Sequence, residues 1–135
     1  MIPALIELQS DYDTLCQRIK PCANGPYTFL TEREDNGAPH VEYSEGVYYH
    51  VVTERGLELE RVSYTDKGEI LFRLVSDMAF WMAVAHEVKH RVPGQDARRI
   101  MFAKWIESMG RVSPEWEART KARIEQILLE NPYLD

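Results

Sequence analysis

The chain has 135 residues, of which 44% are hydrophobic and 28% charged, and its formal net charge is −6. This composition is typical of one soluble globular domain covering residues 1–135, and no apolar run reaches the roughly 18 residues of a membrane span, so no membrane partner is expected. Two cysteines, Cys16 and Cys22, are too few for a disulfide framework. No secretory signal is visible at the N-terminus, so we expect a cytoplasmic protein.

The charge is unevenly distributed. Residues 1–66 hold 12 acidic and 5 basic side chains (−7), whereas residues 67–135 hold 10 and 11 (+1). An acidic surface disfavours nucleic acid as a partner, because such binding depends on Lys and Arg neutralising phosphates. It suits a basic protein partner that is attracted electrostatically. The same charge also fits an acidic face that only keeps the protein soluble.

The first 46 residues predict one helix and two short strands. Apolar residues recur at helical spacing over residues 4–20, and Pro21 stops the pattern. The aromatic and β-branched residues of 27–31 predict a strand. Residues 32–39 form a charged loop, and residues 41–43 predict a second short strand.

The middle of the chain predicts the clearest strands. Residues 47–53 contain two tyrosines and three valines, and Gly56 supplies the positive φ that a tight reversal needs. Residues 57–64 alternate at period two, which indicates a strand with one buried and one wet face. A small antiparallel sheet of three to four strands follows from this pattern.

The second half predicts three helices. Asp66 is a suitable N-cap for a helix over residues 67–90. A second helix over 96–109 follows Pro93-Gly94, and Ser113-Pro114 starts a third that ends near residue 130. The apolar stripe expected to bury the long helix consists of Leu71, Leu74, Val75, Met78, Trp81, Met82, Ala85 and Val88. The expected fold class is α+β: an N-terminal helix, the sheet, then three C-terminal helices.

Several short motifs occur in a distinctive order along the second part of the chain. They are Tyr48-Tyr49-His50-Val51-Val52-Thr53-Glu54-Arg55-Gly56-Leu57-Glu58, Glu87-Val88-Lys89-His90-Arg91, Gly94-Gln95-Asp96-Ala97-Arg98-Arg99, Phe102-x-Lys104 and Pro132. In this order they resemble immunity protein family 63, over about residues 46–135. Members occur beside toxins in bacterial polymorphic toxin systems. The resemblance implies a protein that binds a cognate toxin, and it implies no catalytic residues.

The motif residues themselves are interpreted as structural: Glu54, Arg55, Gly56, Gly94, Asp96, Arg98 and Arg99. Asp96 is expected in the first turn of a helix, where its carboxylate accepts unpaired backbone N–H groups. We expect Arg98 and Arg99 to pair with acids of the long helix, such as Asp77 or Glu87.

A second motif predicts a different chemistry. His86-Glu87-Val88-Lys89-His90 spells H-E-x-x-H, in which two imidazoles one helical turn apart bind zinc and the glutamate is the general base. Asp96 stands where some zinc peptidases place a third ligand, but those enzymes need glycine at the position that Pro93 occupies. We therefore favour histidines on a helix edge and expect no metal and no cofactor. A small zinc metallopeptidase stays open as the alternative.

The preferred hypothesis is a non-enzymatic immunity protein that neutralises its toxin in the cytoplasm by covering it. Because the acidic half of the chain contains carboxylates interleaved with aromatic residues, we expect the toxin-binding surface there, opposite a basic toxin. Its candidate residues are Glu42, Tyr43, Glu45, Tyr48, His50, Glu58 and Glu60. Alternation along the strand places Glu58 and Glu60 on one face, opposite Leu57 and Leu59. A homodimer through the apolar helices is a further alternative.

Overall fold

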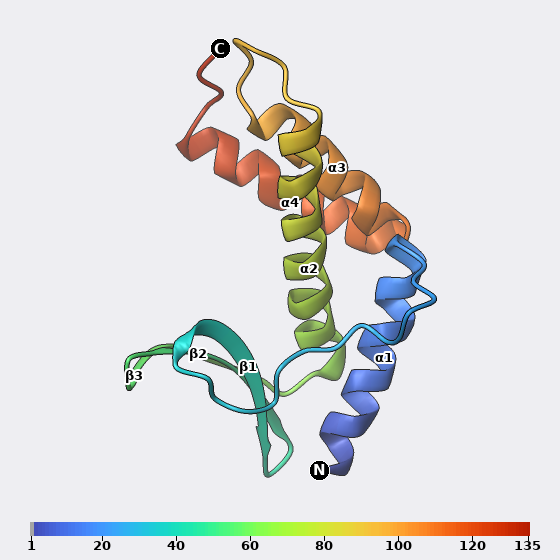
Figure 1. The fold of residues 1–135 in the computed structure, drawn as a ribbon, viewed down its shortest axis with the longest axis vertical. Helices are drawn as coiled ribbons and strands as arrows, with labels where there is room; N and C mark the ends of the chain where they lie inside the picture. The colour runs from blue at the N-terminus through green and yellow to red at the C-terminus, as the bar shows by residue number, and fades with distance from the viewer. Residues whose placement is uncertain (1) are drawn as a thin grey trace. The chain divides into compact units, whose positions relative to one another are not determined.

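A computed structural model describes residues 2–135 of the protein (Figure 1). One helix is followed by three strands and then by three more helices, which confirms the α+β class. The elements are α1 (Pro3–Ile19), β1 (Asn36–Ser44), β2 (Val47–Glu54), β3 (Leu57–Tyr64), α2 (Lys67–Lys89), α3 (Arg98–Gly110) and α4 (Pro114–Glu130).

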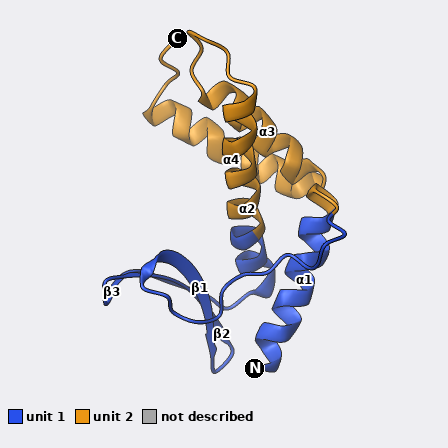
Figure 2. Cartoon of the chain, viewed as in Figure 1, with its two compact units in different colours: residues 1–17, 22–74 blue, residues 18–21, 75–135 orange. Residues whose placement is uncertain are grey.

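The chain divides into two compact units (Figure 2). Unit 1 consists of residues 1–17 and 22–74, and therefore holds most of α1, the sheet and the start of α2. Unit 2 consists of residues 18–21 and 75–135, and holds the rest of α2 together with α3 and α4. That the chain forms one domain stays a prediction.

The sheet of unit 1 is antiparallel, in the order β1-β2-β3. Two-residue turns join its strands, and both turns adopt left-handed backbone angles: Glu45 (φ 50°) with Gly46 (φ 81°), and Arg55 (φ 51°) with Gly56 (φ 79°). Two successive positive φ angles are typical of the type I′ turn, whose twist matches that of paired strands. The predicted reversal at Gly56 is therefore confirmed.

Helix α1 packs through the side chains that its sequence pattern indicated. Leu5, Leu8, Tyr12 and Cys16 are buried in unit 1. Ion pairs from Lys67 Nζ to Glu7 Oε1 (2.6 Å) and Asp11 Oδ2 (2.8 Å) link α1 with the start of α2. The Asp66 carboxylate accepts the Gly68 N–H at 2.7 Å, which confirms the predicted N-cap.

The strand predicted at residues 27–31 is wrong. In this segment the structure has only an isolated bridge, between Leu30 and His40. The ring of Phe29 instead packs edge-on against Tyr12, with centroids 5.4 Å apart, and the Tyr27 N–H donates to Asp13 Oδ1 at 2.8 Å. Side-chain contacts with α1 thus hold this segment. The first strand begins at Asn36, so the predicted loop is shorter and the strand longer than expected.

The prediction that one face of β3 is buried is also wrong. Leu57 is 66% exposed and Leu59 58% exposed, although alternation predicted burial. The register shifts between Val52 and Thr53, so that Val52 pairs with Glu60 and Thr53 pairs with Glu58. This irregularity places an extra residue, Leu59, on β3. Since directly opposed residues share a face, Glu58 and Glu60 lie on opposite faces and not together as predicted.

Unit 2 has its own core. Ile19, Val75, Ala79, Ala83, Phe102, Trp105, Met109 and Ile124 are buried in it. The Trp105 indole N–H donates to the Ser76 carbonyl at 3.2 Å. Helix α4 starts as predicted, since Ser113 Oγ accepts the Trp116 N–H and Pro114 is the first helical residue. Helix α3 begins at Arg98, two residues later than expected.

The buried stripe of α2 is only partly the predicted one. Ala79 and Ala83 are fully buried, whereas Trp81 is 68% exposed and Val88 61% exposed. Leu71, Leu74 and Val75 are buried as predicted. The prediction is wrong for Trp81 and Val88, because towards the end of the helix the buried positions are held by alanines.

Candidate functional site

One face of the sheet carries a cluster of charged side chains around Arg61. Its guanidinium donates to both carboxylate oxygens of Glu58 (2.7 and 3.0 Å) and to Glu42 Oε1 (3.1 Å), and it lies over the Tyr49 ring, 5.3 Å from the centroid. Glu42 also accepts a hydrogen bond of 2.7 Å from buried His40. The cluster remains accessible to a partner, since these Glu42 and Glu58 side chains are each 42% exposed.

These contacts favour the ionised carboxylates. The hydrogen bond from His40, followed by that from Arg61, lowers the pKa of Glu42. The two hydrogen bonds from Arg61 likewise lower the pKa of Glu58. Both groups therefore carry their charge well below neutral pH.

The opposite face holds the remaining strand residues of the predicted surface. Glu60 Oε1 accepts from His50 Nδ1 at 3.0 Å and from Arg73 Nη2 at 3.1 Å. His50 is 1% exposed and Tyr48 is 9% exposed, and the Tyr48 ring lies 4.9 Å from that of Tyr43. His50 and Tyr48 are thus buried in the packing of unit 1, and half-buried Glu60 is held against them by its hydrogen bonds to His50 and Arg73.

Glu45 lies apart from both clusters, exposed at the turn between β1 and β2. The structure therefore brings together Glu42 and Glu58 on one face, and Tyr43, Tyr48, His50 and Glu60 on the other. Sequence reasoning missed Arg61, the residue that organises the first cluster. Residues three apart lie on opposite faces of a regular strand, so the sequence did not predict a pair between Glu58 and Arg61. The two share a face only because of the irregularity at Leu59.

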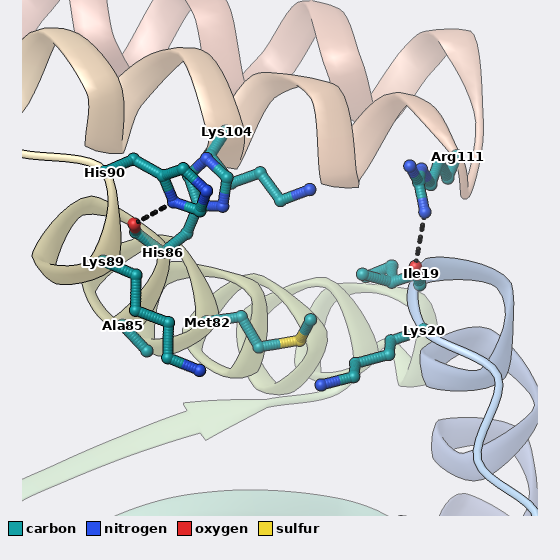
Figure 3. Close-up of a pocket in the computed structure, with 9 residues that line it drawn as sticks. All are labelled: Ile19, Lys20, Met82, Ala85, His86, Lys89, His90, Lys104 and Arg111. Atoms are coloured by element: carbon teal, nitrogen blue, oxygen red, sulfur yellow. Dashed lines mark hydrogen bonds between the residues drawn. The ribbon is translucent and has the colours of Figure 1, made fainter.

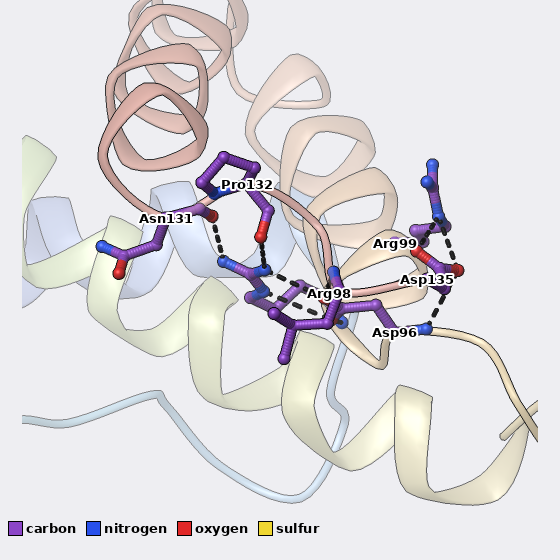
Figure 4. A network of polar contacts seen from close by, with 7 residues as sticks. Asp96, Arg98, Arg99, Asn131, Pro132 and Asp135 are labelled. Carbon is purple, nitrogen blue, oxygen red and sulfur yellow. Dashed lines mark hydrogen bonds and ion pairs between the residues drawn. The ribbon is translucent and has the colours of Figure 1, made fainter.

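The turn between α2 and α3 is held by the Gly94 to Arg99 motif (Figure 4). Gly94 adopts φ 79°, which a side chain would strain. The Asp96 carboxylate accepts the Arg98 N–H (3.0 Å), the Arg98 guanidinium (2.9 Å) and the Leu134 N–H (3.0 Å). The predicted role of Asp96 is confirmed in part: it binds an N–H group at the helix start, but it lies just before the helix.

The two arginines bind the C-terminal segment, not the acids of α2. Arg98 donates to the carbonyls of Asn131 (2.7 Å) and Pro132 (2.8 Å), and Arg99 pairs with Asp135 at 3.0 Å. Arg99 also lies 4.0 Å above the Tyr133 ring. The predicted pairing with Asp77 or Glu87 is therefore wrong. Those acids lie on the preceding helix, whereas the fold brings residues 131–135 back to this turn.

The Asp96 carboxylate accepts hydrogen bonds from the Arg98 side chain and, with a smaller effect, from the Arg98 backbone N–H. These bonds hold the pKa of Asp96 well below its usual range, and the Leu134 N–H lowers it further. The carboxylate is thus a fixed anion that both starts α3 and fastens residues 131–135.

The H-E-x-x-H residues do not form a zinc site. The buried Glu87 carboxylate binds Arg91 through both oxygens (2.8 and 3.0 Å), so both oxygens already have a partner. The rings of His86 and His90 stack with centroids 4.1 Å apart, and His90 Nδ1 donates to the His86 carbonyl at 2.8 Å (Figure 3). Within residues 2–135 no three His, Cys, Asp or Glu side chains are grouped to hold a metal ion. The zinc peptidase alternative is not supported.

With this geometry established, the comparison with known families decides the class. The family model of Immunity protein 63 matches residues 44–126, more than half of the chain. The chain belongs to the Immunity protein 63 family. The match runs from the end of β1 into α4, and it includes the Arg61 cluster except His40 and Glu42, as well as the motif of residues 94–99. Pro132, although part of the resemblance, lies beyond it.

No curated protein and no solved structure matches this member of the Immunity protein 63 family. None of the helices in residues 2–135 combines the length and the apolar run that a bilayer crossing requires.

Proposed function

We infer that the protein protects a bacterial cell by binding a cognate toxin and covering the surface through which that toxin acts. Membership of the Immunity protein 63 family is the observation that carries this conclusion. Such protection needs no chemistry from the protein itself, only a stable interface of about 800 Å² per partner. No metal, cofactor or catalytic group takes part.

We place the contact on the sheet of unit 1. Residues 32–61 hold eight acidic and three basic side chains, giving −5, in a protein of −6 overall. Exposed Glu45, together with the Arg61 cluster, offers anchors to a basic toxin, and exposed Leu57 and Leu59 add apolar area. Buried His50 and Tyr48 support this surface from below.

The interaction is proposed to take place in the cytoplasm. Among the described residues both cysteines are free thiols, Cys16 buried and Cys22 exposed, as is usual in a reducing compartment. The acidic sheet disfavours nucleic acid as the direct partner. A homodimer remains an alternative assembly, to be tested by measuring the molar mass in solution.

Co-expression tests the function. The toxin domain encoded beside this gene should kill cells alone and spare them when this protein is made with it. Survival that is no better with the protein than without it would refute the assignment.

Charge removal tests the surface. We expect Glu45→Gln combined with Glu58→Gln to slow association with the toxin by about three- to tenfold at low salt, and to weaken its salt dependence. Glu60 is avoided because it supports the packing of unit 1. Glu125→Gln, an exposed carboxylate on α4, is the matched control and should bind as the unchanged protein does. Equal rates for both variants would place the contact elsewhere.

A further inference from the structure

Unit 2 contains a cavity of about 350 Å³ that the proposed function does not use (Figure 3). It lies where the end of α1, the second half of α2 and helix α3 meet. Its lining consists of Ile19, Lys20, Met82, Ala85, His86, Lys89, His90, Lys104 and Arg111. No carboxylate is among these residues, although acidic side chains outnumber basic ones in the chain as a whole.

The lining concentrates positive charge. Lys20, Lys89, Lys104 and Arg111 contribute four cations, and Glu107 just outside is shared by Lys104 (3.1 Å) and Arg111 (2.7 Å). Two of these four cations therefore share one carboxylate. Among the described residues, the side-chain ammonium of Lys89 has no hydrogen bond or ion pair. Like charges held this close repel one another, and a bound anion would relieve that repulsion.

The two imidazoles add hydrogen-bonding capacity. His90 uses Nδ1–H for the His86 carbonyl, so its Nε2 can donate to an anion when the ring is protonated. No group within residues 2–135 hydrogen-bonds the His86 ring. Burial, followed by the nearby His90 and Lys104, lowers the pKa of His86. An anion beside it would oppose that shift and favour the protonated, donating ring.

We propose that this cavity binds a small phosphorylated molecule of about nucleotide size. The cations and imidazoles suit phosphate oxygens, and Ile19, Met82 and Ala85 give an apolar wall for the remainder of the ligand. A cavity of this volume falls in the range of small-molecule sites. The net charge of −6 repels an extended polyanion such as nucleic acid, so a small anion is the occupant that fits. The proposal does not rest on toxin binding.

Calorimetry on the full chain at low salt tests the site with three probes: ADP, inorganic pyrophosphate and adenosine. ADP and pyrophosphate should bind, and adenosine should not. Lys89→Glu should weaken ADP binding by about tenfold or more, with Lys89→Gln intermediate. Lys89 is exposed, so neither change should affect folding, which circular dichroism checks.

Arg123→Glu is the matched control, because it alters net charge equally at an exposed position of α4 outside the cavity. It should change ADP affinity by less than about twofold. In nuclear magnetic resonance spectra of the unchanged protein, the imidazole signals of His86 and His90 should shift when pyrophosphate is added.

Three results would overturn the proposal: no binding of ADP or pyrophosphate at millimolar concentration, equal weakening by Arg123→Glu, or unmoved imidazole signals. If no anion binds but Lys89→Glu weakens binding of the toxin, the cavity belongs to a protein interface and the proposal is wrong.

Discussion

Single side chains in this protein gain their roles from partners that are distant in sequence. Asp96 contacts Leu134 and Arg98 binds the Asn131 carbonyl, so one carboxylate and one guanidinium join the start of α3 to the C-terminal segment. The Arg98 bond satisfies the Asn131 carbonyl directly after the end of α4, and the Asp96 bond satisfies the Leu134 N–H in the C-terminal segment. Glu87, in contrast, is held by Arg91, only four residues later and just beyond the end of α2.

The Asp96 carboxylate gives a pH-dependent prediction. Its pKa is lower in the folded protein than the unfolded value of about 3.9, so the folded state favours the ionised form. The stabilisation is therefore complete above the unfolded pKa and is lost as pH falls towards the folded pKa. Asp96→Asn should lower the melting temperature at neutral pH, and the difference from the unchanged protein should shrink between about pH 5 and about pH 2.

Thermal unfolding over that pH series measures the effect. Glu125→Gln is the control, since this exposed side chain on α4 should change stability little at any pH. If Asp96→Asn lowers the melting temperature by the same amount at the highest and the lowest pH, the charge of Asp96 does not have the proposed role.

At the scale of elements, turn chemistry and burial decide what the strands do. Both hairpin turns place a non-glycine residue at positive φ, Glu45 and Arg55, ahead of a glycine. For most side chains this conformation costs about 1 kcal/mol, and asparagine tolerates it best. The sheet therefore forms in spite of two strained positions.

Replacing Arg55 should relieve the backbone strain at one of these two turn positions. Arg55→Asn creates Asn-Gly, the preferred pair for a type I′ turn, and should stabilise the protein by about 0.5–1 kcal/mol. Urea unfolding measures the change. Arg55→Val is the opposite control and should destabilise, because a β-branched side chain fits this φ poorly. If Arg55→Asn unfolds more readily than the unchanged protein, the turn assignment is wrong.

At the scale of the molecule, the charge pattern separates two surfaces. Unit 1 carries the acidic sheet proposed to meet the toxin, whereas unit 2 carries the cationic cavity. The cationic cavity also bears on the H-E-x-x-H motif. Its histidines line a cavity with three lysines and an arginine, which repel a divalent cation.

We therefore expect the purified protein to hold far less than stoichiometric zinc. A tight site at a thousandfold excess of metal over its dissociation constant would add about 4 kcal/mol to stability, so added zinc should leave the melting temperature unchanged. Metal analysis and thermal unfolding with zinc or a chelator measure this. A stoichiometric metal content that disappears in His90→Ala would revive the peptidase hypothesis.

Much of the fold was predictable because its signals are local. Caps at Asp66 and Ser113 and the break at Pro93-Gly94 lie within a few residues of the helix ends they define. The aromatic residues at 27–31 predicted a strand that did not form, since side-chain contacts with α1 satisfied them instead. A propensity describes what a segment prefers, and its neighbours in space can override it.

The candidate site was less predictable. Glu42, Glu45 and Glu58 are accessible as the surface hypothesis requires, but Tyr48 and His50 are buried, and Glu58 and Glu60 point to different faces. A one-residue irregularity in register moves every later side chain to the other face of the sheet, and no local sequence pattern predicts it. The cationic cavity was also missed. Lys104 and Arg111 share a spacing of seven on one helix, which is a usable signal, but Lys20 arrives from another element.

Local chemistry in the chain thus settled the order of helices and strands, the ends of most helices, the acidic first half and the family. Three matters depended on the folded arrangement: which face each strand residue occupies, where Arg98 and Arg99 find their partners, and how residues from three helices enclose a cationic cavity. The physical reason is range. Caps, turns and periodicity act within about four residues, whereas register, buried carboxylates and cavities arise from groups that approach one another only when the chain has folded.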